Sequence, residues 1–157
     1  MRNVVVCLVS LLCALSALAQ GQKLNPRYNL QYNSNGYSQE SPKDALNSVL
    51  KAIKDKRVDY LLAHLTDPDY VDERVKIVHR GDFAALVKEA TKKLIDEPET
   101  VKRLIRFANE GEWETGEKAA SVQLKELKEK VYLRKVDDRW FLENDTKKAA
   151  KAENAEK

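Results

Sequence analysis

Residues 131–145, VYLRKVDDRWFLEND, hold the densest mixture of chemically capable side chains in the sequence. Two adjacent carboxylates, Asp137 and Asp138, lie here among basic and aromatic residues. Three interpretations arise: a carboxylate pair for catalysis or metal binding, a basic and aromatic strand for nucleic acid, or a β-hairpin. The hairpin accounts for the largest number of these residues and is the interpretation we favour.

In this hairpin, Asp137 and Asp138 form a two-residue turn, and Lys135 faces Trp140 across the two strands. Alternation along each strand then divides the side chains between two faces. The face toward the core carries Val131, Leu133, Trp140 and Leu142. The outer face is half apolar and half charged, which makes it a candidate interaction face; it carries Tyr132, Arg134, Val136, Arg139 and Phe141.

Metal binding and nucleic-acid binding both lack the residues that they need. Adjacent carboxylates at a turn tip point apart, and no further ligand follows at a useful spacing in residues 20–157, so we expect no metal, no cofactor and no catalytic residue. Nucleic-acid binding requires exposed aromatics in a basic field. The chain instead mixes 28 basic with 25 acidic residues. This mixture predicts solvated helix faces and no nucleic-acid partner.

The two histidines are weak candidates for chemistry. His64 follows Tyr60 by about one helical turn beside an apolar stripe, so this pair could line a pocket. His79 ends a helical segment just before Gly81, where a cation suits the helix dipole. No Gly-x-Ser-x-Gly motif is present to supply an activated serine. A basic group on two helices is expected to form solvated ion pairs with nearby glutamates; it comprises Lys92, Lys102, Arg103 and Arg106.

The chain begins with the pattern of a secretory signal. Arg2 precedes an apolar run at residues 4–15, and residues 17–19 read Ala-Leu-Ala, as a signal peptidase prefers. The run is shorter than the ~20 residues of a membrane span. We therefore expect cleavage near Ala19 and a secreted or periplasmic protein with no stable membrane anchor. Both cysteines lie in this signal, so residues 20–157 offer neither a disulfide nor a thiol nucleophile.

The rest of the chain divides into three parts. Residues 20–40 are rich in Asn, Gln, Ser and Gly without a sustained period, which predicts a flexible tether, with a tyrosine-dotted recognition arm as the alternative. Residues 41–146 form a single domain. Residues 147–157 contain no large apolar residue and are expected to be a disordered charged tail. Residues 144–146 fit the glycosylation sequon, which matters only in a host that glycosylates.

The domain begins with helices. Ser41, Pro42 and Asp44 form a strong helix start, because they supply a cap, a suitable first residue and a negative charge in the first turn. A second short helix ends at Asp67-Pro68, since proline breaks a helix interior. Three further helical segments follow, near residues 70–78, after Asp82 and after Pro98. The segment after Asp82 points Phe83, Leu86, Val87, Ala90 and Leu94 inward.

After Asn109 the period changes to that of strands. Ala120, Val122 and Leu124 alternate with polar residues, which predicts an antiparallel meander of about three to four strands. Residues 125–130 have high helix propensity, but we interpret them as a charged, twisted connection. The expected fold class is therefore α+β, with N-terminal helices packed on a curved, cone-like antiparallel sheet.

Two stretches carry a resemblance to a known superfamily. SPKDALNSVLKAIKDKRVDYLLAHLTDP, with Asp59 opening its second helix, precedes a meander whose last strand holds Arg139-Trp140-Phe141-Leu142. Over residues 41–144 this order resembles the nuclear transport factor 2-like superfamily, which includes SnoaL-like and ketosteroid-isomerase-like domains, and also small exported bacterial proteins of unknown function. The resemblance implies a cone of helices in a curved sheet, and enzymes of the superfamily place an Asp, Tyr or His inside it.

No position of this sequence matches a catalytic motif of that superfamily. The stretch between the second helix and the sheet is also longer and more helical, so apolar helix could fill the cone. We expect an exported, non-catalytic interaction or binding domain that binds a protein partner or forms a homodimer through the outer sheet face. The alternative is a small apolar-ligand binder, or a degenerate enzyme, that uses the cone pocket.

Overall fold

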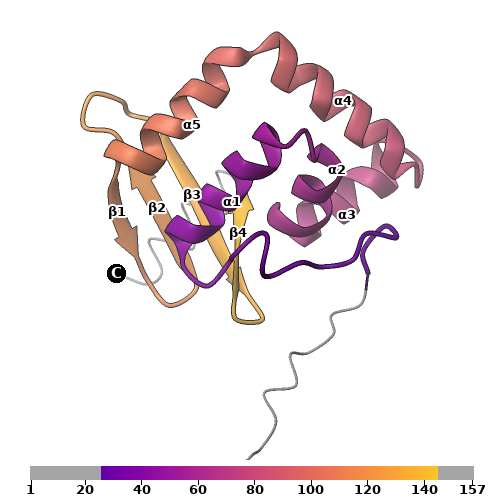
Figure 1. Ribbon diagram of the computed structural model, residues 1–157, viewed down its shortest axis with the longest axis horizontal. Helices are drawn as coiled ribbons and strands as arrows, with labels where there is room; N and C mark the ends of the chain where they lie inside the picture. Colours follow the sequence, from indigo (N-terminus) through magenta and orange to yellow (C-terminus); the bar gives the residue numbers. More distant parts are fainter. Residues whose placement is uncertain (1–25, 145–157) are drawn as a thin grey trace, which may run out of the picture.

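The computed structural model describes residues 26–144, and in these residues helices precede a sheet, as expected for the α+β class (Figure 1). The helical part contains five α-helices and one π-helical turn: α1 (Pro42–Lys54), α2 (Val58–Tyr60), η1 (Leu61–Leu65), α3 (Pro68–Ile77), α4 (Phe83–Asp96) and α5 (Pro98–Glu110). Four strands follow: β1 (Glu112–Thr115), β2 (Ala119–Gln123), β3 (Lys130–Val136) and β4 (Arg139–Glu143).

The helix starts follow the predicted capping chemistry. The Ser41 hydroxyl accepts a hydrogen bond from the Asp44 amide at 3.1 Å, and Pro42 occupies the first position of α1. The Asp82 carboxylate accepts from the Ala85 amide at 3.0 Å and caps α4. These local signals fix where the long helices begin.

The strands form one antiparallel meander in the order β1-β2-β3-β4. Asp137 and Asp138 connect β3 to β4 with φ angles of 46° and 63°, as a two-residue hairpin turn with two left-handed residues requires. Lys135 pairs with Trp140, so the predicted register of the hairpin is confirmed. The chain between β2 and β3 is not helical, as expected for residues 125–130.

One face of the sheet packs on α1 and α5, which cross it in Figure 1. Leu46 of α1 and Phe107 of α5 meet Leu133 and Trp140 of the sheet in a single apolar cluster. Trp140 is 5% exposed, which confirms its assignment to the core. Helix side chains thus fill the space over this face, where the cone-like arrangement would place its pocket.

Residues 26–40, here named the N-terminal arm, correct the expectation of a flexible tether. Tyr37 and Gln39 are buried, with exposed fractions of 6% and 2%. Gln39 pairs with Trp140 along β4: its carbonyl accepts from the Trp140 amide at 3.0 Å, and its side-chain amide donates to the Trp140 carbonyl at 2.7 Å. Polar residues of the arm form hydrogen bonds with the rest of the domain, so the polar composition of this segment does not indicate a free chain.

The expected signal (residues 1–19), residues 20–25 of the expected tether, and the expected tail (residues 147–157) lie outside the described residues. Within residues 26–144, no helix is long and apolar enough to cross a membrane.

Candidate functional site

The outer face of the hairpin is more covered than expected. Phe141 is 2% exposed, so the expectation that it lies on a partly wet surface is wrong. The Arg139 guanidinium lies over the Phe141 ring at 5.0 Å and over the Tyr32 ring of the arm at 4.7 Å. Tyr132 and Val136 are half-buried. Of the apolar side chains in the predicted interaction face, Tyr132 and Val136 therefore remain partly accessible to solvent.

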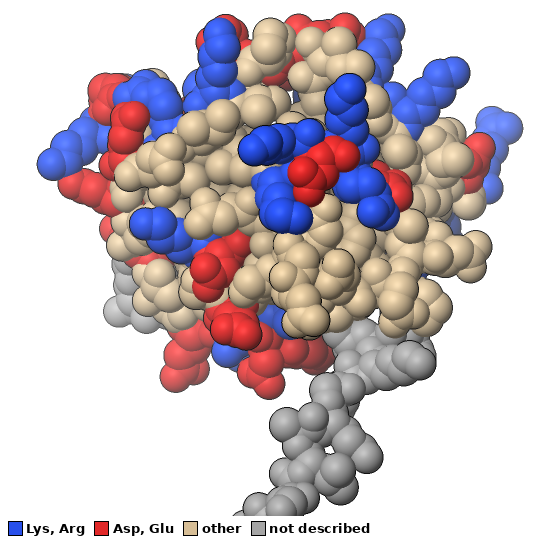
Figure 2. All heavy atoms as spheres, in the orientation of Figure 1, with Lys and Arg blue, Asp and Glu red and all other residues tan. Residues whose placement is uncertain are grey.

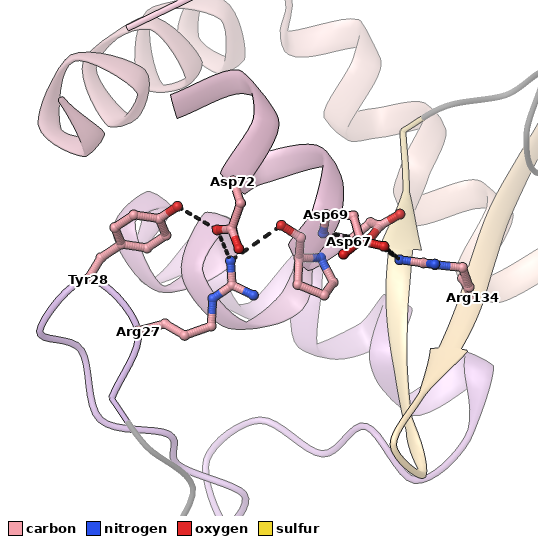
Figure 3. A network of polar contacts seen from close by, with 7 residues as sticks. Arg27, Tyr28, Asp67, Asp69, Asp72 and Arg134 are labelled. Atoms are coloured by element: carbon pink, nitrogen blue, oxygen red, sulfur yellow. Dashed lines mark hydrogen bonds and ion pairs between the residues drawn. The ribbon is translucent and has the colours of Figure 1, made fainter. Parts of the chain in front are cut away.

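Arg134, also predicted for the interaction face, joins β3 to the start of α3 (Figure 3). Its guanidinium donates to the carboxylate of Asp67, which is 1% exposed, and to Asp69 at 2.8 Å. A buried carboxylate is costly unless a cation and hydrogen bonds compensate it. Arg134 therefore has a structural role within this network.

Tyr60 and His64, the predicted pocket residues, are both 2% exposed and hold the arm in place. The Tyr60 hydroxyl accepts from the Asn33 amide at 2.9 Å. The His64 Nε2–H lies 2.8 Å from the Leu30 carbonyl oxygen, to which it donates in the neutral ring. Burial lowers the pKa of His64, which favours that neutral form. Neither residue lines the groove described below.

Three of the four members of the predicted basic group on the helices form ion pairs, and Lys92 is exposed. Lys102 lies 2.7 Å from Glu99, and Arg103 lies 3.1 Å from Glu129. Arg106 contacts Glu110 and Glu126. Basic and acidic side chains both lie around a broad uncharged area on the face seen in Figure 2. Surface pairs of this kind contribute little stability.

A groove of about 380 Å³, here named the α4 groove, lies between α4, the η1–α3 segment and the end of β4. Its apolar side chains are Leu61, Leu62, Leu86, Ala90, Leu94 and Leu142. The inward stripe of α4 was predicted, but the groove was not. The sequence feature that could have indicated the groove is Ala90. It is a small residue in a stripe of larger apolar residues, so it leaves a space that a leucine would fill.

Besides Thr66, Tyr70 and Asn144, the polar rim of the α4 groove contains two engaged pairs and one lysine. Arg74 donates to Glu89, and His79 Nε2 lies 3.0 Å from the same carboxylate. The hydrogen bond from Arg74 lowers the pKa of Glu89. Thr100 contacts Glu97 at 3.4 Å. Lys93 also lines the groove, and within residues 26–144 no hydrogen bond or ion pair engages its ammonium.

Among residues 26–144, no group of three or more His, Cys, Asp or Glu side chains is arranged to hold a metal ion. Comparisons with protein-family models, with curated proteins and with solved structures each find no match.

Proposed function

We propose that the protein is an exported, non-catalytic binding domain that holds a small, largely apolar ligand in the α4 groove. The observation that carries this proposal is the groove itself. Its volume of about 380 Å³ lies within the range of ~300–1,000 Å³ that is usual for ligand pockets. An apolar floor is also usual in such pockets, and eight polar or charged side chains complete the lining of this one.

The surroundings of the titratable groups support binding over catalysis. A general base must reach a substrate proton, directly or through one water. His64 instead contacts a backbone carbonyl in the interior, and Tyr60 contacts the backbone of the arm. His79 contacts Glu89, which already accepts from Arg74. These contacts give each group a structural role.

Two sequence-based interpretations enter the proposal as hypotheses. The signal pattern at residues 1–19 supports export and a secreted or periplasmic location. The order of helices before an antiparallel meander is what the resemblance to the nuclear transport factor 2-like superfamily implies. The proposed ligand site differs from the superfamily's cone pocket, because α1 and α5 occupy the space over the sheet.

The proposal is tested with N-phenyl-1-naphthylamine, a neutral probe whose fluorescence rises in apolar surroundings. We expect a saturable fluorescence increase with the unmodified protein. Ala90→Leu should weaken probe binding at least about tenfold, because the added side chain occupies the groove. Ala84→Leu, on an exposed position of the same helix, should leave binding unchanged. Absence of saturable binding, or equal binding by both variants, contradicts the proposal.

A second proposal is a homodimer through the outer sheet face. It is supported by Tyr132 and Val136, two half-buried apolar residues that flank Arg134 on that face of β3. Sedimentation of the unmodified protein at tens of micromolar tests it. A dimer that Val136→Lys converts to a monomer supports the proposal, and a monomer of the unmodified protein contradicts it.

A further inference from the structure

We propose that the ligand of the α4 groove is an amphiphile with a single negative charge, such as a carboxylate, and that Lys93 binds this charge. The inference rests on the proposed function of the groove and adds the chemical class of the ligand. It follows from the buried floor, from the charges at the rim and from the groove's size.

The floor determines the body of the ligand. Leu61 and Leu62 are each 7% exposed and Leu86 is 3% exposed, so aliphatic carbon forms this surface. Aliphatic side chains offer no hydrogen bonds, and a polar group placed against them would lose its hydration without compensation. The part of the ligand that lies on the floor is therefore apolar.

The rim determines the sign of the head group. Arg74 and Glu89 neutralise each other, with His79 also on the Glu89 carboxylate. Lys93 is the cation of the groove that no described partner engages. An anionic head group supplies a partner for this exposed ammonium while the body of the ligand lies on the apolar floor.

The carboxylates at the rim limit the charge to one. Glu89 and Glu97 both line the groove, and Lys93 lies four residues from each along α4. Because Arg74 already balances Glu89, the repelling charge at the rim is that of Glu97. It repels a dianionic head group such as a phosphate monoester more strongly than a monoanion, whose single charge Lys93 can balance. The Asn144 amide at the same rim provides a neutral hydrogen-bond donor for the second oxygen of a carboxylate.

The test compares three probes that share a ten-carbon chain: decanoate, 1-decanol and decyltrimethylammonium, each below its micelle concentration at about pH 8. Competition against N-phenyl-1-naphthylamine gives their affinities. Decanoate should bind about tenfold more tightly than decanol, because its carboxylate can accept a charged hydrogen bond from Lys93 and the hydroxyl of decanol cannot form an ion pair. Decyltrimethylammonium should bind more weakly than decanol.

Two lysine variants assign the charge preference. Lys93→Gln should lower decanoate affinity about tenfold, to the level of decanol, and leave decanol affinity unchanged. Lys92→Gln is the matched control, because Lys92 is exposed on the same helix but does not line the groove. It should change neither affinity. Both lysines are exposed, so neither substitution should alter the melting temperature by more than a few degrees.

The outcomes separate the two proposals. Equal affinity for decanoate and decanol, or equal effects of both lysine variants, overturns the charge inference while the groove remains a binding site for apolar ligands. Failure of the neutral probe and all three amphiphiles to bind overturns the proposed function and the inference together. A preference for decanoate that Lys93→Gln removes supports both.

Discussion

Asp137 and Asp138 show how a chemically conspicuous pair can have a conformational role. Both residues have positive φ, at 46° and 63°. Aspartate tolerates this left-handed region better than most residues, which is why it suits a two-residue turn. The Asp138 side chain is 99% exposed. The Asp138 carboxylate therefore lies in water at the tip of the hairpin, 3.4 Å from the Lys135 ammonium.

Trp140 and Asp138 should differ sharply in their effect on stability. Trp140→Ala should lower the free energy of unfolding by about 3–5 kcal/mol, because it leaves a large cavity in the sheet–helix cluster. Asp138→Ala should change it by less than about 1 kcal/mol, because the side chain is exposed. Denaturant unfolding of both variants measures the difference, and the reverse order would contradict the hairpin register.

His64 should make stability depend on pH. Burial lowers its folded-state pKa from the usual 6.5. As the pH falls below about 6.5, the His64 ring takes up a proton more readily in the unfolded chain than in the folded protein. The stability that comes from burying the neutral ring is therefore complete above about pH 6.5 and is lost as the pH falls toward the folded-state pKa. The nearby Arg139 and Arg27 act in the same direction.

The free energy of unfolding of the unmodified protein should therefore fall as the pH drops below about 6.5, toward the lowered folded-state pKa of His64. His64→Gln should reduce this slope, since glutamine can still donate to the Leu30 carbonyl but does not titrate. His79→Gln serves as the control and should retain more of it. Denaturant unfolding at several pH values gives the slopes, and an unchanged slope in His64→Gln would exclude the assignment.

At the scale of elements, the N-terminal arm is attached at both ends. Near its start, the Tyr28 ring stacks on Phe83 of α4 with ring centres 3.9 Å apart, and its hydroxyl donates to Asp72 of α3 at 2.6 Å (Figure 3). Burial and this hydrogen bond raise the pKa of Tyr28 to about 12. Near its end, Gln39 pairs with β4. The arm therefore ties the helices to the sheet.

Two variants of Tyr28 should separate the stack from the hydrogen bond. Tyr28→Phe keeps the stack on Phe83 and should cost about 1 kcal/mol of unfolding free energy. Tyr28→Ala removes both contacts and should cost about 2–3 kcal/mol. Limited proteolysis should cut the arm faster in Tyr28→Ala. Equal stability and equal cleavage in all three proteins would contradict attachment of the arm through this residue.

The sequence predicts the elements whose signals are local and misses those whose partners are distant. Caps at Ser41 and Asp82 and the Asp137-Asp138 turn act over a few residues, so their patterns are readable. The arm was misassigned because the bond between Gln39 and Trp140 spans 101 positions. Few apolar residues suggested a free chain, although amide side chains and tyrosines provide its contacts.

At the scale of the whole molecule, the candidate site was the least predictable feature. The periodicity of apolar residues correctly places Leu86, Ala90 and Leu94 on the inward face of α4. It does not predict which other elements lie opposite that face, or how closely they approach it. The end of β4 contributes Leu142, and the distance it keeps from α4 is set by the tertiary fold. Phe141 was misplaced for a related reason, since the Arg139 guanidinium lies over its ring and also over that of Tyr32 in the distant arm.

The mature protein should begin at Gln20. The sequence Ala-Leu-Ala at residues 17–19 after a short apolar run is the pattern that signal peptidase cleaves. The intact mass of protein recovered from outside the cytoplasm measures the start directly. A mass that retains residues 1–19 would contradict cleavage and favour a membrane-anchored protein instead.

The position of the arm has a consequence for self-association into fibres. The edge of β4 away from β3 receives the Gln39 backbone and, further along, the Asp67 amide, which donates to the Leu142 carbonyl at 2.8 Å. An exposed strand edge is a template on which other chains add, and proteins commonly cover such edges. At the opposite edge of the sheet, β1 is four residues long and carries Glu112 and Glu114, features that discourage such addition.

A chain that begins at Ser41 would leave the Trp140 backbone groups without their Gln39 partners. We expect this shortened protein to form thioflavin T-positive aggregates at concentrations where the chain that begins at Gln20 stays clear, with fibre formation followed by fluorescence and light scattering. A shortened protein that remains monomeric would contradict this. The N-terminal arm, whose composition suggested a free tether, therefore protects the edge of β4. Proteolytic removal of the arm should expose this edge and promote aggregation.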